Sequence, residues 1–385
     1  MLPLLETALL PIGAERLRKE VRGFLAEQTA AGAFVGTCDS WLSGWDESFT
    51  EQLAARGWVG MTIPTKYGGH GRSALERYVV IEELLAAGAP VAAHWVADRQ
   101  SAPSLLRYGT ELQRQSFLPK IAQGRCFFAI GMSEPDSGSD LASVRTVAQR
   151  VKGGWELYGT KVWTSGAHRA HFFVVLARSE PLGPDRHAGL TQFIVNLRGQ
   201  GVEIRPIPLL TGAHDFNEVV LNGVFVPDAH VLGEVGSGWR QVTSELGFER
   251  SGPERFLSTF LLLASLAHHL ESSSSSTTAE TEEIGELLAR LITLRQMSLS
   301  VAAALSEGSE VDVQAALVKD LGTRFEQEVV ERVRLVSHVF ADQDAAPGTL
   351  AYHLARSTLH SPGFTLRGGT NEVLRGIVAR ALGHQ

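Results

Sequence analysis

GWELYGTKVWTSG, residues 154–166, separates this chain from an all-helical protein. Its apolar side chains tend to recur at every second position, as in a strand with one buried face, and a glycine stands at each end. Four further segments between residues 125 and 235 show the same period and are separated by Gly, Pro and Asn: HFFVVLAR, TQFIVNLR, GVEIRPIPL and NEVVLNGVFVP. The pattern predicts a small, mostly antiparallel β domain or barrel at residues 125–235.

The sequence on either side, residues 1–124 and 236–385, has helical periodicity. Segments such as AERLRKEVRGFLAEQ and IGELLARLITLRQMSLSVAAALSEG place apolar side chains at i, i+3 and i+4 with charges between them. We therefore expect an α+β protein with a helical domain, a central β domain and a C-terminal helical bundle. One polar, low-complexity stretch, ESSSSSTTAETEE at 271–283, predicts a mobile loop between two long helices.

The bulk composition excludes several classes of protein. A formal charge of -7 and a pI near 6.0 give no basic field for nucleic acid. The two cysteines, Cys38 and Cys126, form no CxxC pair or His/Cys cluster, so we expect neither a disulfide framework nor a metal site, and a reducing cytoplasm is the expected compartment. MLPLLETALLPIG does not resemble a signal peptide, and we find no apolar run of about 18 residues, so no membrane partner is expected.

Five short motifs follow one another along the chain: IPTKYGGHG (63–71), RYGTELQRQSFLPKIAQG (107–124), SEPDSGSD (133–140), GTKVWTSGA (159–167) and RGGTNEVLRGIVAR (367–380). Each motif alone is a weak signal. In this order and at this spacing, the five together resemble the acyl-CoA dehydrogenase family over nearly the whole chain.

The resemblance implies a flavoprotein with an N-terminal helical domain, a central β-barrel domain and a C-terminal four-helix bundle. In that family FAD lies between the β domain and the bundle, and a neighbouring subunit holds part of it. The flavin takes a hydride when an acyl-CoA thioester is desaturated between its α and β carbons. The resemblance thus implies FAD as the cofactor, an acyl-CoA as the substrate and electron-transfer flavoprotein as the electron acceptor.

The resemblance also assigns residues to the flavin, motif by motif. Trp163 would lie along the ring and Ser165 near its N5 locus, while Ser133 and Ser139 would offer hydroxyl and backbone donors, Ser139 also towards the substrate. A reduced flavin gathers negative charge, which such donors stabilise in a dry site. Alternatively, Ser and Gly in SEPDSGSD serve turns and Trp163 is a core strand residue. The full expected cofactor set is Ile130, Met132, Ser133, Ser139, Trp163, Ser165, Thr370 and Glu372.

The reaction also needs a carboxylate that removes the α-proton, with a pKa raised by burial. The family usually carries it where this chain has Gly368, which has no side chain, although the Gly368 N–H suits a second family role as a donor to the thioester carbonyl. A minority, typified by isovaleryl-CoA and long-chain acyl-CoA dehydrogenases, carries the base earlier, in a Leu-x-x-Glu-Arg-like stretch. LGFERSG at 246–252 matches that stretch, so Glu249 is the expected base and Arg250 a substrate contact.

The alternative for Glu249 is a solvated helix glutamate paired with Arg250 or Arg255. The catalytic interpretation is favoured because Glu249 stands among apolar neighbours just before Pro253 and because position 368 carries no acid. Glu254 is a rival, but on a continuous helix it would lie on a different side from Glu249.

A second departure from the family pattern concerns the FAD pyrophosphate and adenosine. The Arg-x-x-Phe-Gly and Gln-x-x-Gly-Gly-x-Gly motifs that reach a neighbour's FAD are replaced here by the region of ESSSSSTTAETEE and by SHVFADQDAAPG, which lacks the needed glycines. Because a guanidinium–pyrophosphate pair is a strong interaction, a homo-oligomer would hold FAD poorly. We expect a heteromer with a paralogous subunit, as in the α2β2 branch that often acts on steroid side-chain thioesters.

Two other interpretations keep the fold. The chain could be the non-catalytic subunit of such a pair, although the retained SEPDSGSD and KVWTSG motifs and Glu249 argue against this. It could also be a flavin oxidase or an acyl-carrier-protein dehydrogenase, because one fold hosts several chemistries.

Overall fold

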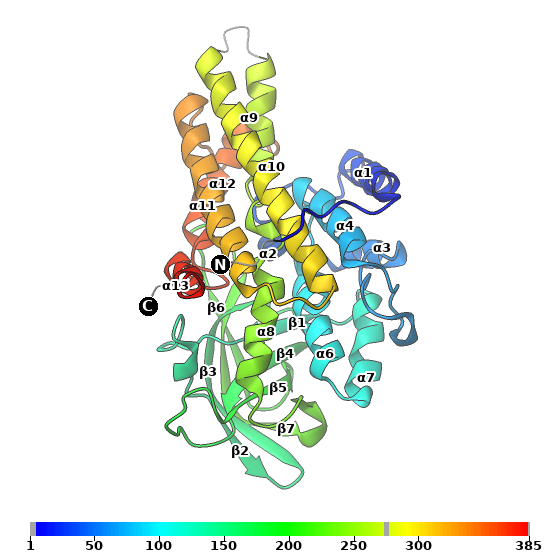
Figure 1. Cartoon of the computed structure of the whole chain (residues 1–385), viewed down its shortest axis with the longest axis vertical. Coiled ribbons are helices and arrows are strands. Elements are labelled where there is room, and N and C mark those ends of the chain that lie inside the picture. Colours follow the sequence, from blue (N-terminus) through cyan, green and yellow to red (C-terminus); the bar gives the residue numbers. More distant parts are fainter. Residues whose placement is uncertain (1–4, 273–276, 384–385) are drawn as a thin grey trace. The chain divides into compact units, whose positions relative to one another are not determined.

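The computed structural model of the chain (Figure 1) describes residues 5–272 and 277–383, and for residues 246–249 it describes the backbone alone. The chain divides into two compact units. Unit 1 consists of Met1–Gly44, Ser73–Pro90 and Gly247–Gln385, and unit 2 of Trp45–Arg72 and Val91–Leu246. Helix α8 (Gly238–Arg250) passes from unit 2 into unit 1.

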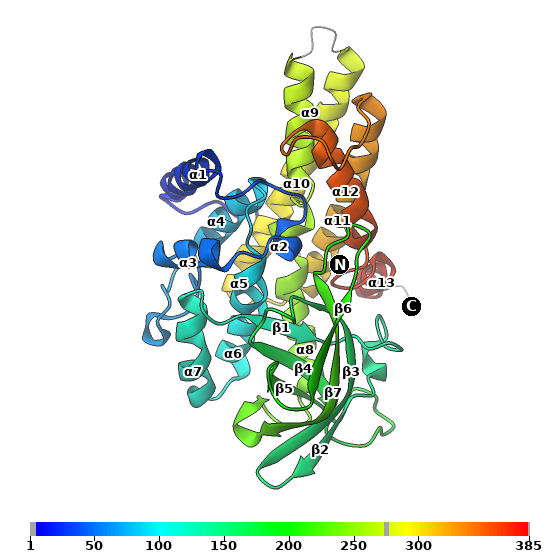
Figure 2. The same cartoon turned by 180° about the vertical axis from the view of Figure 1, so that it is seen from behind.

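Unit 2 is built on one mixed sheet with the order β6-β7-β3-β2-β4-β5-β8, and β1 pairs in parallel with β4 (Figure 2). The β2–β3, β3–β7, β4–β5, β5–β8 and β6–β7 pairs are antiparallel. The predicted β region is thus confirmed as a sheet. The strands are β1 (Phe128–Gly131), β2 (Val147–Val151), β3 (Gly154–Ser165), β4 (Phe172–Arg178), β5 (Leu190–Asn196), β6 (Val202–Ile207), β7 (Phe216–Pro227) and β8 (Val231–Leu232).

Two apolar clusters hold the sheet in place. Leu157, Phe173 and Phe193 lie in the first, formed mainly by side chains of the sheet itself. In the second, Phe117 and other helix residues pack on strand residues that include Phe128. The helices of unit 2 are α3 (Glu47–Ala55), α5 (Ala92–Val96), α6 (Ala102–Tyr108) and α7 (Glu111–Ala122), with a π-helical turn at Ala97–Ser101 and 3₁₀ turns at Thr65–Tyr67, Leu141–Ser143 and Asp228–His230.

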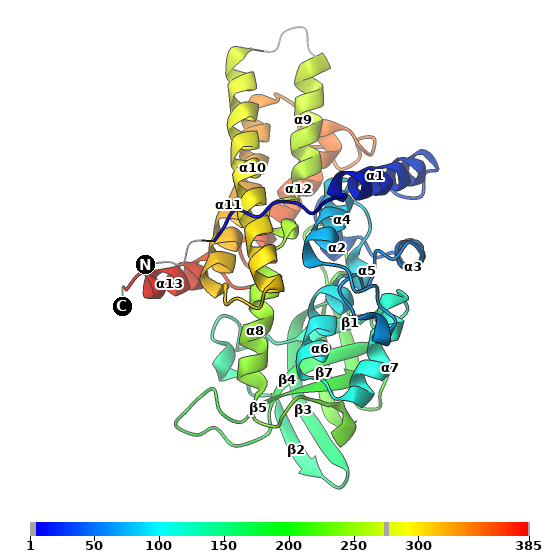
Figure 3. The ribbon, with the colours of Figure 1, turned by 45° about the vertical axis from the view of Figure 1, so that its right-hand side comes forward.

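Unit 1 contains the C-terminal bundle, in which α11 packs against α9, α10, α12 and α13 (Figure 3). On α10, Leu287, Leu291 and Leu294 are buried at the spacing of one helix face. Helix α4 packs against α1 and α10. The helices of unit 1 are α1 (Ala14–Ala30), α2 (Ser40–Ser43), α4 (Ala74–Ala86), α9 (Phe260–Ser272), α10 (Thr278–Ser306), α11 (Asp312–Val336), α12 (Leu350–Phe364) and α13 (Asn371–Ala381).

The loop predicted at 271–283 is shorter than expected. Helix α9 continues through Ser272, and α10 begins at Thr278 because Thr277 and Glu280 form a capping box, whereas residues 273–276 lie outside the described residues. By length and composition alone, α10 is long and apolar enough to cross a membrane, with 39% of its apolar window buried. A helix packed inside a bundle meets the same criterion, and α10 packs against α4, α9 and α11.

The helical region predicted at residues 236–385 is also interrupted near its start. Helix α8 ends at Arg250, a 3₁₀ turn follows at Pro253–Arg255, and α9 starts at Phe260. A proline ring cannot continue the helical hydrogen bonding, which accounts for the interruption. Glu254 therefore lies off α8, so the helical-wheel argument that set it apart from Glu249 was wrong. Glu254 is buried.

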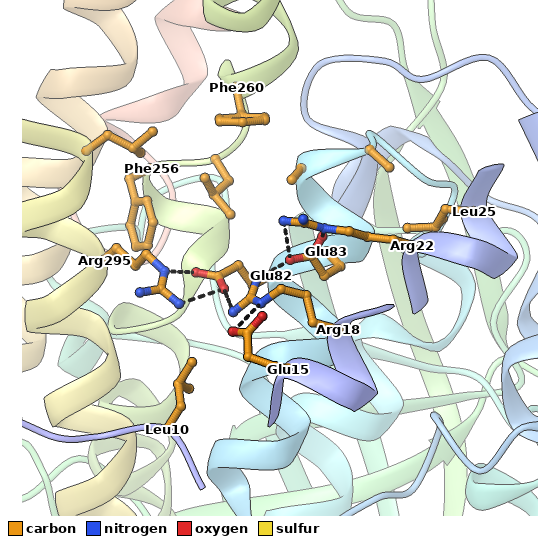
Figure 4. A pocket seen from close by; sticks show the side chains of 14 residues that line it. Leu10, Glu15, Arg18, Arg22, Leu25, Glu82, Glu83, Phe256, Phe260 and Arg295 are labelled. Atoms are coloured by element: carbon orange, nitrogen blue, oxygen red, sulfur yellow. Dashed lines mark hydrogen bonds and ion pairs between the residues drawn. The ribbon is translucent and has the colours of Figure 1, made fainter. Parts of the chain in front are cut away.

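Four chain segments of unit 1 line a pocket that contains a ladder of ion pairs (Figure 4). Glu82 of α4 binds Arg18 of α1 and Arg295 of α10, and Glu83 binds Arg18 and Arg22. Each of these two buried carboxylates is paired with arginines, so the ion pairs that line the pocket link α1, α4 and α10.

Candidate active site

Two adjoining segments of unit 2 carry most of the residues predicted to face the flavin. Ile130 lies in strand β1, and Met132 and Ser133 follow that strand, while the end of β3 holds Trp163 and Ser165. The Val162 N–H donates to the Ser133 carbonyl at 2.9 Å, so the two segments lie side by side. The structure thus brings these five predicted residues onto one pair of neighbouring segments.

Trp163 has the unusual conformation of the group. Its φ is 60°, a left-handed value that is costly for a bulky residue, and its side chain is 58% exposed. Its ring contacts Phe216 edge-on, with centroids 5.9 Å apart. The alternative of a core strand residue is therefore wrong, because Trp163 presents its ring outside the core of unit 2.

The SEPDSGSD motif forms a tight turn. Glu134 and Ser137 exchange backbone hydrogen bonds, and the Ser137 hydroxyl donates to the Asp140 carbonyl at 3.0 Å. Ser137 thus stabilises the turn through its hydrogen bonds, whereas Ser139 is exposed on the turn. No described hydrogen bond joins Ser139 to Ser133, and its role at the cofactor stays a prediction.

A buried ion pair lies behind these segments. Lys161, fully buried, donates to the Glu134 carboxylate at 2.8 Å and to the Met132 carbonyl at 3.1 Å. Glu134 also accepts from the Arg145 N–H at 2.6 Å and the Thr146 N–H at 2.9 Å. Burial acts to raise the pKa of Glu134, but Lys161 and the N–H donors outweigh it and hold that pKa below its usual value.

For the pKa of Lys161, burial outweighs the effect of the ion pair. Burial lowers the pKa of its ammonium to about 8, although Glu134 partly opposes this effect. Because Lys161 also binds the Met132 carbonyl, the ion pair fixes the backbone just before Ser133. Sequence reasoning missed both residues, although both stand inside motifs that mark the family.

Gly368 and Gly369 form a glycine corner in unit 1, between α12 and α13. Gly368 and Gly369 have φ values of 69° and 94°, a conformation that favours glycine. Arg250 Nε donates to the Gly368 carbonyl at 3.1 Å, and Lys319 Nζ donates to the Gly369 carbonyl at 2.5 Å. Two cations therefore fix the corner through its carbonyl oxygens, and Lys319 is a third residue that sequence reasoning missed.

Beyond the corner, Thr370 is the N-cap of α13. Its hydroxyl accepts from the Val373 N–H at 3.5 Å. Glu372 stands in the first turn of α13, where a hydrogen bond from its own backbone N–H and one from Thr370 hold its pKa below the usual value. Both residues thus stabilise the start of α13, and their assignment to FAD stays a prediction.

Glu249 lies in the last turn of α8, next to Arg250, and its side chain lies outside the described residues. Arg250 is buried, and its Nε donates to the Gly368 carbonyl of the glycine corner. The Arg250 side chain thus links the end of α8 to the glycine corner within unit 1.

Comparison with known proteins gives the class of this chain. Family models of acyl-CoA dehydrogenases match it in three successive parts: the N-terminal domain at residues 13–125, the middle domain at 129–224 and the C-terminal domain at 236–383. The chain is 34% identical to acyl-CoA dehydrogenase IpdE1 of Mycobacterium tuberculosis, over 96% of this chain and 97% of that protein. It is 33% identical to acyl-CoA dehydrogenase FadE34 of the same organism over 94% of this chain, but spans only 49% of that longer protein.

Two solved structures resemble the chain along its whole length. The Tcur3481-Tcur3483 steroid ACAD superimposes with a TM-score of 0.86 and 28% identity, over 99% of this chain and 100% of that chain. The ChsE4-ChsE5 complex from Mycobacterium tuberculosis gives a TM-score of 0.81 and 28% identity, over 99% and 100% of the two chains. The chain belongs to the acyl-CoA dehydrogenase family, whose members are FAD-dependent oxidoreductases.

The residues of this chain fit that cofactor. Trp163 offers an exposed aromatic face. Ser133, on the neighbouring segment, is half-buried and offers a hydroxyl and a backbone N–H. The family thus confirms the expected fold and FAD dependence.

Proposed function

We propose that the chain catalyses the α,β-dehydrogenation of an acyl-CoA thioester, with Glu249 as the base that removes the α-proton. The observation that carries the proposal is the 3.1 Å hydrogen bond from Arg250 Nε to the Gly368 carbonyl, which joins the end of α8 to the glycine corner. A base on α8 then acts beside the corner where the family usually places its carboxylate.

Each group of the corner has a distinct role in this proposal. The Gly368 N–H donates to the thioester carbonyl as enolate-like charge develops, and Glu249 takes the α-proton. Arg250 and Lys319 hold the two carbonyls of the corner, so that the N–H is oriented before the substrate arrives. Trp163 and Ser133 would hold FAD, which would supply the acceptor for the hydride from the β-carbon.

We further propose a heteromer with a paralogous acyl-CoA dehydrogenase subunit, and electron-transfer flavoprotein as the electron acceptor. The segment after α11, residues 337–348, lacks the paired glycines that would hold a neighbour's FAD, and it exposes Phe340. The names of two similar structures, a two-component steroid ACAD and the ChsE4-ChsE5 complex, favour two unlike subunits and a steroid side-chain thioester as the substrate class.

The base assignment is tested by Glu249→Gln, with Glu254→Gln as the matched control at the rival carboxylate. Turnover per bound flavin, followed with isovaleryl-, octanoyl- and a steroid side-chain acyl-CoA, should fall about 10²- to 10⁴-fold in Glu249→Gln, while the flavin absorbance persists. Glu254→Gln should retain turnover. Loss of turnover in Glu254→Gln alone would identify Glu254 as the base instead.

The heteromer is tested by the flavin content and the subunit stoichiometry of the chain, expressed alone and with candidate paralogues. Visible absorbance and light scattering should show little FAD on the chain alone and about one FAD per unlike pair after co-expression. One FAD per chain in a homo-oligomer would replace this proposal with a self-sufficient dehydrogenase.

A further inference from the structure

Arg367, the residue before Gly368, is held in a buried aromatic and ionic cage within unit 1. Its Nη1 donates to Asp39 Oδ2 at 2.7 Å. Its guanidinium lies 4.8 Å from the Trp41 ring centroid and 5.6 Å from that of Phe364. A planar guanidinium that stacks and donates at once is fixed in direction as well as in position.

Asp39 is itself fixed from several sides. It is 2% exposed, its backbone N–H donates to the Ser258 carbonyl at 3.2 Å, and its Oδ2 lies 3.2 Å from His360 Nδ1. Burial acts to raise the pKa of Asp39, but Arg367 and His360 outweigh it and hold the pKa below its usual value. Asp39 also has a φ of 60°, an uncommon backbone conformation outside glycine.

The cage fixes the position of one peptide group, the one between Arg367 and Gly368. On one side, the side chain of Arg367 is bound to Asp39; on the other, the carbonyl of Gly368 is bound to Arg250. The Gly368 N–H belongs to the peptide between these two anchors. Its direction therefore depends on Asp39, which stands 328 residues earlier in the chain than Arg367.

We propose that Asp39 is a positioning residue for the reaction: through Arg367 it orients the Gly368 N–H towards the thioester carbonyl. This inference rests on the proposed function, because it gives that N–H a catalytic use. The anchoring of the corner by Asp39 is, however, measurable without any substrate.

The experiment compares Asp39→Asn with Glu82→Gln in the full chain with its flavin bound, co-expressed with the paralogous subunit where FAD binding requires it. Each change removes one buried carboxylate charge from unit 1, and Glu82 lies in the separate ion-pair ladder of α1, α4 and α10 (Figure 4). Both variants should lose stability. Only Asp39→Asn should act on the corner.

The first measurement is hydrogen–deuterium exchange of the peptide that contains residues 366–370, without substrate. It should exchange at least about tenfold faster in Asp39→Asn than in the wild type and remain unchanged in Glu82→Gln. The second is steady-state kinetics with the fastest of the three acyl-CoA substrates above. A misdirected donor should lower kcat about 10- to 100-fold in Asp39→Asn, with KM changed less than about threefold.

Wild-type exchange at the corner in Asp39→Asn would overturn the proposal, and so would an equal acceleration in Glu82→Gln, since that would reflect general loosening. Faster exchange with unchanged kcat would support the anchoring and overturn the use of the Gly368 N–H in the proposed function. Should Asp39→Asn not fold, Arg367→Lys keeps a cation for Asp39 but loses the stacked planar fork, and it should give the same two changes.

Discussion

Two buried glutamates, one in each unit, differ in protonation: Glu134 is held ionised and Glu326 is held neutral. Glu134 in unit 2 is bound by the Lys161 ammonium and two backbone N–H groups, which hold its pKa low. Glu326 in unit 1 accepts from the Ser258 N–H at 2.8 Å, and burial, reinforced by the nearby Asp39, raises its pKa to about 8.

The difference shows that burial alone does not set the charge of an acid. In unit 2 the Lys161 ammonium is buried beside the Glu134 carboxylate, and Lys161 also fixes the Met132 carbonyl, next to residues predicted to face the flavin. In unit 1 the Arg367 guanidinium binds Asp39, and it lowers the pKa of Glu326 by less than burial raises it. Glu326 is then stable as a neutral acid near neutral pH.

The largest expected effect comes from breaking the unit 2 pair with Lys161→Met. Glu134 would keep its two N–H donors but lose its cation, and a buried charge left without its partner costs about 3–5 kcal/mol. The variant should unfold at lower denaturant concentration and bind FAD more weakly, because Lys161 also holds the Met132 carbonyl. Chemical unfolding and a fluorescence titration with FAD measure the two effects.

The double variant Glu134→Gln/Lys161→Met is the control for this change. Removing both charges should recover part of the lost stability, which would identify the uncompensated carboxylate as the source of the loss. If Lys161→Met is as stable as the wild type, the ion pair does not contribute to the free energy of unfolding, and Glu134 is stabilised by its N–H donors alone.

The elements could be predicted from the sequence because they follow from local patterns. Alternation in GWELYGTKVWTSG becomes β3 (Gly154–Ser165), and the glycine pair at 368 and 369 marks a corner before a helix. The limits of the elements were less predictable: Thr277 and Glu280 extend α10 into a stretch whose composition suggested a loop.

The contacts that build the site could not be predicted, because they join residues far apart in the chain. Lys161 and Glu134 come from different parts of the sheet, and Asp39 reaches Arg367 across almost the whole sequence. A single sequence contains no periodicity that records such pairs. The exposed, left-handed Trp163 was also hidden, since its strand pattern favoured neither face decisively.

A smaller effect distinguishes the neutral acid of unit 1 from the ionised one of unit 2. A carboxyl whose folded pKa is raised contributes its full stability below the unfolded pKa and loses it as the pH rises through the folded pKa. Between pH 5 and pH 7, the wild type should therefore lose about 2–3 kcal/mol of unfolding free energy through Glu326. Glu326→Gln should lack this loss, so its stability relative to the wild type should increase with pH in denaturant titrations.

Glu328→Gln on the same helix is the matched control. Arg290 and Arg332 lower the pKa of Glu328 below 4.5, so its contribution is complete above that pH and is lost only as the pH falls further. Its removal should therefore leave the relative stability nearly unchanged between pH 5 and pH 7 and shift it in the opposite direction at lower pH. The same trend in both variants would show that Glu326 is ionised in the folded protein.

The smallest effect concerns the glycine corner and separates backbone strain from catalysis. Gly369→Ala and Gly348→Ala each place a side chain at a positive φ, 94° and 87°, which should cost about 1 kcal/mol in either variant. A Cβ at 348 meets nothing within 4 Å, whereas a Cβ at 369 would lie 3.3 Å from Arg250 Nη2. Thermal unfolding should thus report similar losses, while kcat should fall only in Gly369→Ala, because displacing Arg250 releases the Gly368 carbonyl. Equal kcat values in the two variants would mean that the Arg250 contact stabilises the corner without orienting it for the reaction.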